Sequence, residues 1–438
     1  MSKPDPQHVV VVGAGIVGVS AAIWLLRKGV DVTIVDAQAP GSEKAASFGN
    51  AGILAACSVA PVTAPGMVRK SPKMLLDPNF PLFLRWSYLP RLAPWLLKYL
   101  SNANDNDTRR IARGIAPITY DSMEQHRALT KGTAAAQWLT SSDYSFVYPN
   151  RAAFEADQYT WMLRKSAGFE PELIEGSAVR EFEPNLSPDL KLLAVMRDHG
   201  YIRDPGSYIA ALARAAEDLG AKFLKADVSD FTFEDGRVSA VVTRDETLSC
   251  SHVILAAGVW SGALAKKLGL SVPLETERGY HIEFSAPVNG PRTPLMLTTG
   301  KFVATPMENG LRCAGIVEFG GLQAGSSKAP LALLRRKVKE SFPAFSFEGE
   351  KPWLGHRPAP SDSLPLIGEI NNTGIIAGFG HHHIGLTAGP KTGRILAGIV
   401  TGQWENIDLA AYDPMRFQTH FQNRIPARRD NHQAKKGA

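Results

Sequence analysis

The sequence contains little cysteine. Only Cys57, Cys250 and Cys313 occur among 438 residues. Their wide spacing matches neither a disulfide framework nor a metal site built from paired thiolates. We therefore expect three reduced thiols with structural roles.

Long apolar runs are also missing. No stretch of about 18 uninterrupted apolar residues occurs, so a transmembrane helix is not expected. The first residues, MSKPDPQH, lack the basic start and apolar core of a secretory signal. These absences predict a chain that stays in the cytoplasm.

Acidic residues are scarce only near the C-terminus. The net charge is +6 at pH 7. Beyond residue 413 a single acid, Asp430, faces Arg416, Arg424, Arg428, Arg429, Lys435 and Lys436. Because the excess lies in a tail, no nucleic-acid partner is expected. We expect residues 416–438 to form a basic, partly disordered tail, with a weak contact to an anionic membrane surface as the alternative.

Residues 9–36 contain the most informative pattern. An apolar strand runs into G-x-G-x-x-G at Gly13, Gly15 and Gly18, and a helix and a second strand follow, ending in Asp36. This order is that of the dinucleotide-binding βαβ unit. The glycines permit a tight turn, close approach of the backbone to a pyrophosphate, and close packing of helix on sheet. The sequence therefore predicts a bound dinucleotide.

The helix over residues 16–28 would direct its unpaired N–H groups at the phosphates. Asp36 can accept hydrogen bonds from the ribose hydroxyls of an adenosine, and its charge would repel a 2′-phosphate. NADP is therefore disfavoured.

The aromatic, leucine-rich segment at residues 78–100 has two interpretations. Trp86, Tyr88 and Trp95 beside Arg85 and Lys98 would suit a membrane interface. The segment would equally suit a helical layer covering the second domain. Both interpretations remain open at this stage.

Six motifs in order carry a family resemblance. They are VVVVGAGIVGVS, SFGNAGIL, VILAAGVWS, RGYHIEF, WLGHRPAPSDSLPLIG and GFGHHHIGLTAGPKTG. With them the chain resembles the FAD-dependent D-amino-acid dehydrogenase and glycine oxidase group of the DAO superfamily over essentially its whole length. The resemblance implies FAD, held without a covalent bond.

The resemblance also implies the fold class, α/β and α+β overall, of the DAO or glutathione-reductase-2 type. It has a Rossmann-like FAD-binding domain and a substrate domain with an antiparallel sheet. We expect the FAD-binding domain to comprise residues 1–75, 200–270 and 350–415. The substrate domain then comprises residues 76–199 and 271–349.

Motif positions and the small residues around them supply the expected cofactor-binding set. It consists of Gly13, Gly15, Ile16, Val17, Gly18, Asp36, Ser47, Asn50, Ala51, Gly52, Ile53, Val228, Ala257, Gly258, Trp260, Gly380, His383, Gly385, Leu386 and Thr387. A helix over residues 386–400 follows the GHHHIG loop, and its N-terminal dipole would stabilise negative charge developing on a reduced flavin.

Relatives pair the arginine of the GHRP motif, here Arg357, with the substrate carboxylate, which the planar guanidinium fork suits. Arg278, Tyr280 and His281 are the further expected substrate-binding residues, either in that role or as members of a packed strand. Arg357, Tyr280 and His383 form the expected catalytic set.

The consecutive histidines at 381–383 invite a metal interpretation. Consecutive residues cannot all converge on one ion, and no cluster of cysteines or acids lies nearby in sequence. No metal site is therefore expected.

The resemblance implies hydride transfer from the Cα of an amino acid, expected to be a D-amino acid, to flavin N5. The product is an imino acid, which yields an oxo acid and ammonia. One alternative is a cyclic or N-substituted substrate such as D-proline, hydroxyproline or a sarcosine-like compound. Another is a non-catalytic FAD-binding subunit of an electron-transfer complex. The acceptor, quinone or oxygen, stays open, as do the oligomeric state and a peripheral contact with the inner membrane.

Overall fold

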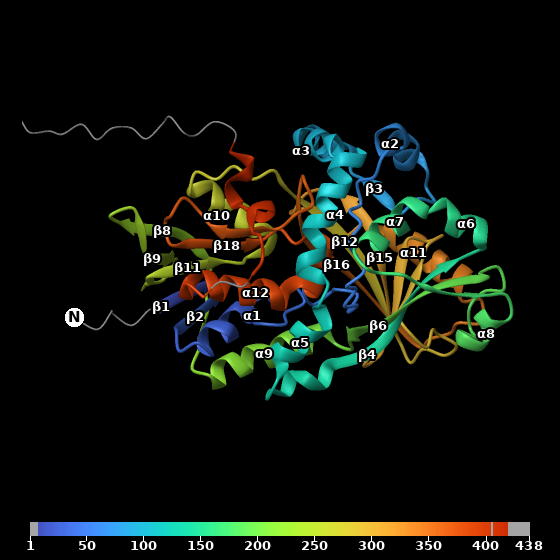
Figure 1. Cartoon of the computed structure of the whole chain (residues 1–438), viewed down its shortest axis with the longest axis horizontal. Coiled ribbons are helices and arrows are strands. Elements are labelled where there is room, and N and C mark those ends of the chain that lie inside the picture. The colour runs from blue at the N-terminus through green and yellow to red at the C-terminus, as the bar shows by residue number, and fades with distance from the viewer. Residues whose placement is uncertain (1–7, 404–405, 419–438) are drawn as a thin grey trace, which may run out of the picture.

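Two large sheets of different construction organise the chain (Figure 1). The structure is a computed structural model that describes residues 8–403 and 406–418. Figure 1 places the mostly parallel sheet in one half of the molecule and the larger, mostly antiparallel sheet in the other half. The boundary between these halves positions the site.

The first sheet has six strands in the order β17-β18-β11-β1-β2-β7. β17 runs antiparallel to β18, and the other neighbouring pairs are parallel. The bounds are β1 (His8–Val12), β2 (Asp31–Asp36), β7 (Lys222–Lys225), β11 (His252–Leu255), β17 (Leu366–Glu369) and β18 (Ile375–Phe379). Four consecutive valines, Val9 to Val12, form the rest of β1 after His8, and they are buried because both faces of the strand are covered.

Helices cover one face of this sheet. Val9 and Val11 pack in the same core as α1 (Ile16–Leu26), α9 (Pro205–Asp218) and α12 (Gly385–Thr401). α1 and α12 lie close together because Gly393 of α12 has no side chain. A Cβ at this position would lie only 2.5 Å from the Cβ of Ser20 in α1.

A smaller sheet and a short helix cover the other face. Val10 and Val12 pack with residues of this three-stranded sheet and of the helix. The bounds are β8 (Val228–Glu234), β9 (Arg237–Thr243), β10 (Thr247–Ser249) and α10 (Ser261–Lys267).

The second large sheet has the order β16-β12-β15-β14-β13-β4-β6-β5, and β3 pairs with β15. Its bounds are β3 (Leu82–Leu84), β4 (Leu139–Tyr148), β5 (Glu172–Glu175), β6 (Leu192–Ile202), β12 (Leu274–Ser285), β13 (Leu295–Leu297), β14 (Phe302–Met307), β15 (Gly310–Phe319) and β16 (Gly349–Pro360). The helix α11 (Lys328–Ser341) packs against it through Leu333, Leu334 and Val338. Three short helices lie elsewhere in this half, α6 (Arg151–Ala156), α7 (Gln158–Ser166) and α8 (Ala178–Phe182).

The expected domain bounds differ from this arrangement in two places. β16 pairs with β12 along its whole length, so residues 350–360 belong to the second sheet rather than to the FAD-binding domain. The helices α4 (Asp105–Thr119) and α5 (Ser122–Thr130), expected in the substrate domain, bury Ile111, Ile115 and Leu129 in the core of α1 and α12. Both differences depend on partners distant in sequence.

Residues 78–100 form β3, a 3₁₀ turn (Trp86–Tyr88) and α3 (Leu89–Ser101). The inner face of α3 buries Trp95 and Tyr99, and the Trp95 indole N–H donates to Ala359 O at 2.9 Å. This face forms the helical layer that was one of the two interpretations. Trp86 and Leu97 stay exposed. Within the described ranges, every helix is too short or too polar to span a membrane.

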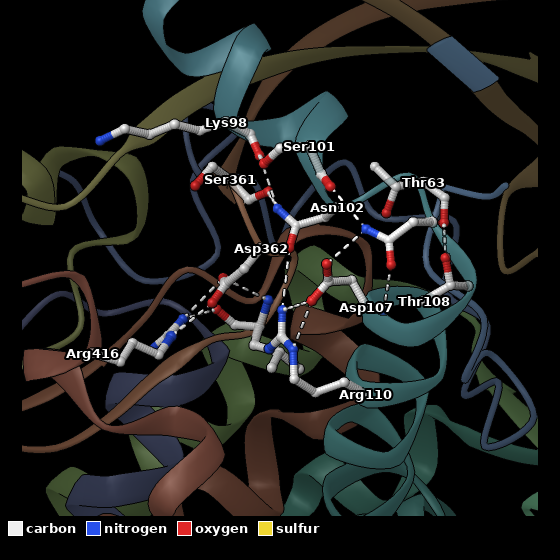
Figure 2. A network of polar contacts seen from close by, with 12 residues as sticks. Thr63, Lys98, Ser101, Asn102, Asp107, Thr108, Arg110, Ser361, Asp362 and Arg416 are labelled. Atoms are coloured by element: carbon white, nitrogen blue, oxygen red, sulfur yellow. Dashed lines mark hydrogen bonds and ion pairs between the residues drawn. The ribbon is translucent and has the colours of Figure 1, made fainter. Parts of the chain in front are cut away.

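A polar network ties the corner between α3 and α4 to the segment after β16 (Figure 2). Arg110 donates to Asn102 Oδ1 at 3.1 Å, and Asn102 Nδ2 donates to Ser361 O at 3.1 Å. Beside them Arg416 binds both carboxylate oxygens of Asp362, at 2.7 and 3.1 Å. The first cation of the expected basic tail is thus anchored, and residues 419–438 lie outside the described residues.

Candidate active site

A cavity of about 920 Å³ opens where the two large sheets meet, and both contribute to its wall. Its volume is in the upper part of the range found for cofactor and ligand pockets. All of the expected cofactor-binding residues line it except Gly18 and Gly52.

Gly18 and Gly52 shape the backbone around the cavity instead. A Cβ on Gly18 would lie 1.9 Å from Gly13 O, so only glycine lets α1 approach the turn after β1. Gly52 has φ +80°, and a Cβ there would meet Ile202 O at 2.6 Å.

The turn after β1 has the features of a dinucleotide cradle. Gly13 has φ +114°, and a Cβ would lie 2.4 Å from Ala256 O. Gly15 precedes the first turn of α1 and lines the cavity. A bare backbone beside a helix N-terminus suits a pyrophosphate. These residues therefore fit the diphosphate of FAD.

Asp36 ends β2 at the edge of the same cavity. Oδ2 accepts from the Ala14 N–H at 2.7 Å, and Oδ1 accepts from the Gln38 N–H at 2.8 Å. Burial raises the pKa of Asp36, and these two bonds oppose the rise. The carboxylate retains lone pairs for ribose hydroxyls.

The N-terminus of α12 faces the same cavity from another side. Its first residues, Gly385, Leu386 and Thr387, line the wall, and no side chain in the described part of the chain caps its N-terminal N–H groups. The buried His126 holds this end by donating from Nε2 to Leu386 O at 3.0 Å, while its Nδ1 accepts from Tyr208 Oη at 2.7 Å. A positive helix end is thus fixed where a flavin carbonyl would be stabilised.

Glu277 is the centre of the polar cluster beside this helix. Cross-strand register places it opposite Arg357, whose Nη1 donates to Glu277 Oε1 at 2.7 Å. Glu277 Oε2 accepts from His382 Nε2 at 2.8 Å and from His383 Nε2 at 3.2 Å. Glu277 is only 3% exposed, whereas Arg357, His382 and His383 line the cavity. The buried carboxylate therefore orients three side chains that the cavity exposes.

The protonation states follow from these contacts. Burial alone would raise the pKa of Glu277, but His383 and His382 hold that pKa well below its usual range. Loss of hydration lowers the pKa of His383 to about 4, although Glu277 opposes this shift. Glu277 is therefore ionised and His383 neutral near pH 7. His383 then donates through Nε2 and keeps Nδ1 as an acceptor.

Two of the three consecutive histidines converge on one carboxylate, and the third turns away from it. His382 adopts φ +49°, and with its neighbour His383 it reaches Glu277, while His381 turns away to Thr392 Oγ1 at 3.0 Å. The ligand-type atoms of Glu277, His382 and His383 lie within 4.8 Å of one another. Both Nε2 atoms are engaged by the carboxylate, and Arg357 adds a positive charge there, which disfavours a cation.

Arg278, Tyr280 and His281 do not line this cavity, which corrects their expected roles as substrate-binding residues and that of Tyr280 as a catalytic residue. Arg278 Nη1 and Tyr280 Oη both bind the buried Glu318, at 2.8 and 2.7 Å. His281 Nδ1 donates to Gly49 O at 2.9 Å, and the His281 ring stacks on the ring of Trp353. Because side chains alternate along β12, Gly279 faces the cavity while its neighbours Arg278 and Tyr280 point away.

Sequence reasoning missed Glu277, whose only signal was a carboxylate inside a strand expected to be half buried. It also missed Arg164, Tyr144 and Lys301, which line the cavity outside the motifs. No local pattern distinguishes these three residues.

Comparison with known proteins identifies relatives of this chain. The chain is 38% identical over 420 residues to a D-amino-acid oxidase of Bradyrhizobium diazoefficiens, covering 94% of this chain and 100% of that protein. It is 28% identical over 420 residues to a D-amino acid dehydrogenase of Rhizobium rhizogenes, with the same coverage. The fold matches a crystal structure of glycine oxidase from Geobacillus kaustophilus with a TM-score of 0.71 at 20% identity, covering 94% of this chain and 99% of that one.

A family model described as FAD dependent oxidoreductase, DAO, matches residues 8–399. The chain therefore belongs to the DAO family of FAD dependent oxidoreductases, and FAD is its cofactor.

Proposed function

We propose that this chain oxidises a D-amino acid at Cα, giving an imino acid that hydrolyses to an oxo acid and ammonia. FAD, when bound, supplies the two-electron acceptor for this chemistry. The observation that supports the proposal most directly is Arg357, a guanidinium at the cavity wall fixed by Glu277 at 2.7 Å. The two relatives named D-amino-acid oxidase and D-amino acid dehydrogenase also support it.

Arg357 binds the substrate carboxylate. Glu277 occupies one N–H of Nη1, so the rest of the guanidinium fork remains for a planar anion. The pair fixes the position of the substrate Cα before the reaction, which lowers the entropic cost of reaching the reactive geometry.

His383 positions the amine. Its imidazole is neutral near pH 7, donates to Glu277 and offers Nδ1 as an acceptor. A base this weak suits a substrate that binds with its amine unprotonated, because the histidine then accepts a hydrogen bond rather than a proton.

The test is the visible spectrum of the purified holoenzyme, recorded without oxygen as amino acids are added. D-amino acids, glycine, sarcosine and hydroxyprolines form the panel. Bleaching of the flavin bands by D-amino acids is the expected result. Bleaching only by proline-like or N-methyl compounds would favour the cyclic or N-substituted alternative. A yellow protein that no compound bleaches would favour the non-catalytic subunit.

We also propose that a membrane quinone accepts the electrons. Four exposed apolar side chains support this, Val68 and Leu76 of α2 (Met67–Leu76), Trp86, and Leu97 of α3. Exposed apolar side chains beside cations suit a lipid interface. Sedimentation with vesicles containing anionic lipid should fall when Trp86 and Leu97 are both changed to serine. Leu219→Ser, which alters an exposed leucine elsewhere, is the control. Complete solubility of the unmodified chain beside vesicles would contradict the proposal.

A further inference from the structure

Arg164 is a buried cation that has no carboxylate partner within residues 8–403 and 406–418. It lies on α7, is 7% exposed and lines the same cavity as Arg357. Arg278 and Arg312, buried to a similar degree, bind Glu318 and Glu283 respectively. Among the described residues no acid forms an ion pair with Arg164, and its Nε and Nη1 have no hydrogen-bond partner.

Aromatic rings hold the guanidinium in place. Its carbon lies 4.2 Å from the centroid of Phe146 and 4.4 Å from that of Trp161. Cation–π contacts of this kind orient an arginine but leave its N–H groups unsatisfied. Because Nε and Nη1 are buried, Nη2 is the nitrogen that remains to face the cavity.

Neighbouring titratable groups do not neutralise this charge. Burial raises the pKa of Cys57 to about 11 and also raises that of Tyr144, although Arg164 lowers both. The thiol and the phenol therefore stay uncharged near pH 7. A buried, unpaired charge is costly, which indicates that Arg164 serves a ligand.

The part of the wall around Arg164 selects for anions. It includes Tyr144, Phe146 and Met296, which carry no negative charge, and Lys301 adds a further cation to the cavity. The acids that line the cavity lie in the half of the molecule that holds the six-stranded sheet, where Asp36 ends β2 and Asp227 precedes β8. A ligand group that reaches Arg164 therefore meets positive charge on an apolar background.

We propose that Arg164 binds a second anionic group of the substrate, so that the preferred substrates are amino acids with an acidic side chain. Arg357 holds the α-carboxylate and Arg164 the distal carboxylate. The inference rests on the proposed function, because it takes Arg357 as the α-carboxylate site. A distal carboxylate would supply the charge-assisted hydrogen bonds that Arg164 lacks.

The test compares substrates of equal shape and different charge. Anaerobic flavin bleaching is followed with D-aspartate against D-asparagine and with D-glutamate against D-glutamine. We expect the acid of at least one pair to react with a kcat/KM at least about tenfold higher. Equal or faster reaction of both amides would overturn the inference while leaving the proposed function intact. Absence of bleaching by any amino acid would instead count against the proposed function.

A variant pair assigns the preference to this residue. Arg164→Gln should abolish the preference for the acid, and Arg164→Lys should retain part of it. Arg197→Gln is the matched control, because Arg197 is an exposed arginine that pairs with Asp143 and Glu172. An acid preference that persists in folded, yellow Arg164→Gln would contradict the assignment.

A binding measurement that needs no turnover complements these rates. Succinate and its monoamide succinamate, neither of which is an amino acid, are titrated while perturbation of the flavin spectrum is recorded. Succinate should bind at least about tenfold more tightly to the unmodified holoenzyme, and this advantage should vanish in Arg164→Gln. Equal affinity of Arg164→Gln and the unmodified protein for succinate would overturn the inference. If Arg164→Gln does not fold, the comparisons of acids with amides in the unmodified protein still decide it.

Discussion

Glu277 and Arg357 face each other across β12 and β16, and Arg357 Nη1 lies 2.7 Å from Glu277 Oε1. The carboxylate is buried and the guanidinium reaches the cavity. The pair therefore acts as one unit, in which an inner anion fixes the orientation of an outer cation.

Removing the inner charge should disorder that unit. Glu277→Gln should lower kcat/KM by about 10- to 100-fold, because the common acceptor of Arg357 and His383 loses its charge and one of its two accepting oxygens. It should also lower the free energy of unfolding by about 3–5 kcal/mol, because it breaks a buried pair. Steady-state kinetics and thermal unfolding measure the two effects. Glu275→Gln, on the same strand, is the control for kinetics, and an equal loss of activity in it would contradict the specific role.

Removing the outer charge should affect substrate more than cofactor. Arg357→Ala should raise KM at least about 100-fold, since it removes charge-assisted bonds to the carboxylate. Arg357→Lys should recover only part of that loss because an ammonium lacks the planar fork. The flavin spectrum should stay at full intensity. Unchanged amino-acid affinity in Arg357→Ala would refute the anchor role.

Asp36 should contribute to FAD affinity. Asp36→Ala removes an ionised acceptor for the ribose hydroxyls and should weaken FAD binding roughly 10- to 100-fold. Fluorescence titration of the apoprotein with FAD measures this change. Asp31→Ala, at the exposed start of the same strand, should bind FAD normally. Tight FAD binding by Asp36→Ala would show that the ribose contact is dispensable.

Gly18 should tolerate no side chain. Gly18→Ala places a Cβ 1.9 Å from Gly13 O, so α1 must move away from the turn. We expect a loss of about 3 kcal/mol or more in the free energy of unfolding, together with weaker retention of FAD. A Cβ on Gly325 meets no atom within 4 Å, so Gly325→Ala should stay within about 0.5 kcal/mol of the unmodified protein. Similar melting temperatures for both variants would contradict this packing argument.

Stability should fall in mild acid partly through His126. Burial lowers the pKa of His126 to about 4, below the usual 6.5. As the pH falls, His126 therefore becomes protonated in the unfolded chain before it does so in the folded protein. The free energy of unfolding decreases as the pH falls from about 6.5 to about 4. The slope should be about 1.4 kcal/mol per pH unit for this residue. Denaturant unfolding across that range should show a shallower slope for His126→Gln, and an unchanged slope would disprove the contribution.

The dinucleotide cradle could be predicted because its determinants are local. Strand, glycines, helix and Asp36 follow one another within 9–36, and steric requirements of the backbone select glycine there. The GHHHIG loop and the helix after it could also be predicted from the sequence. α12 begins at Gly385, one residue before the expected start.

The polar cluster could not be predicted in the same way. Glu277 and Arg357 are far apart in sequence and meet only because β12 and β16 pair in one register. Arg278 and Tyr280 were expected at the cavity because they share a motif, but a strand shows alternate side chains to opposite faces. Which face meets the cavity depends on what packs against each side of the sheet.

The sequence by itself determined the cofactor cradle, the family and the arginine of the GHRP motif, because these are short contiguous patterns whose backbone geometry is set by neighbouring residues. Only the tertiary structure decided the partners of Arg357, the placement of Arg278, Tyr280 and His281 away from the cavity, and the burial of Arg164 without an ion-paired acid among the described residues. These features depend on long-range strand pairing and on the packing of α7 against β4, which bring together residues that the chain keeps apart.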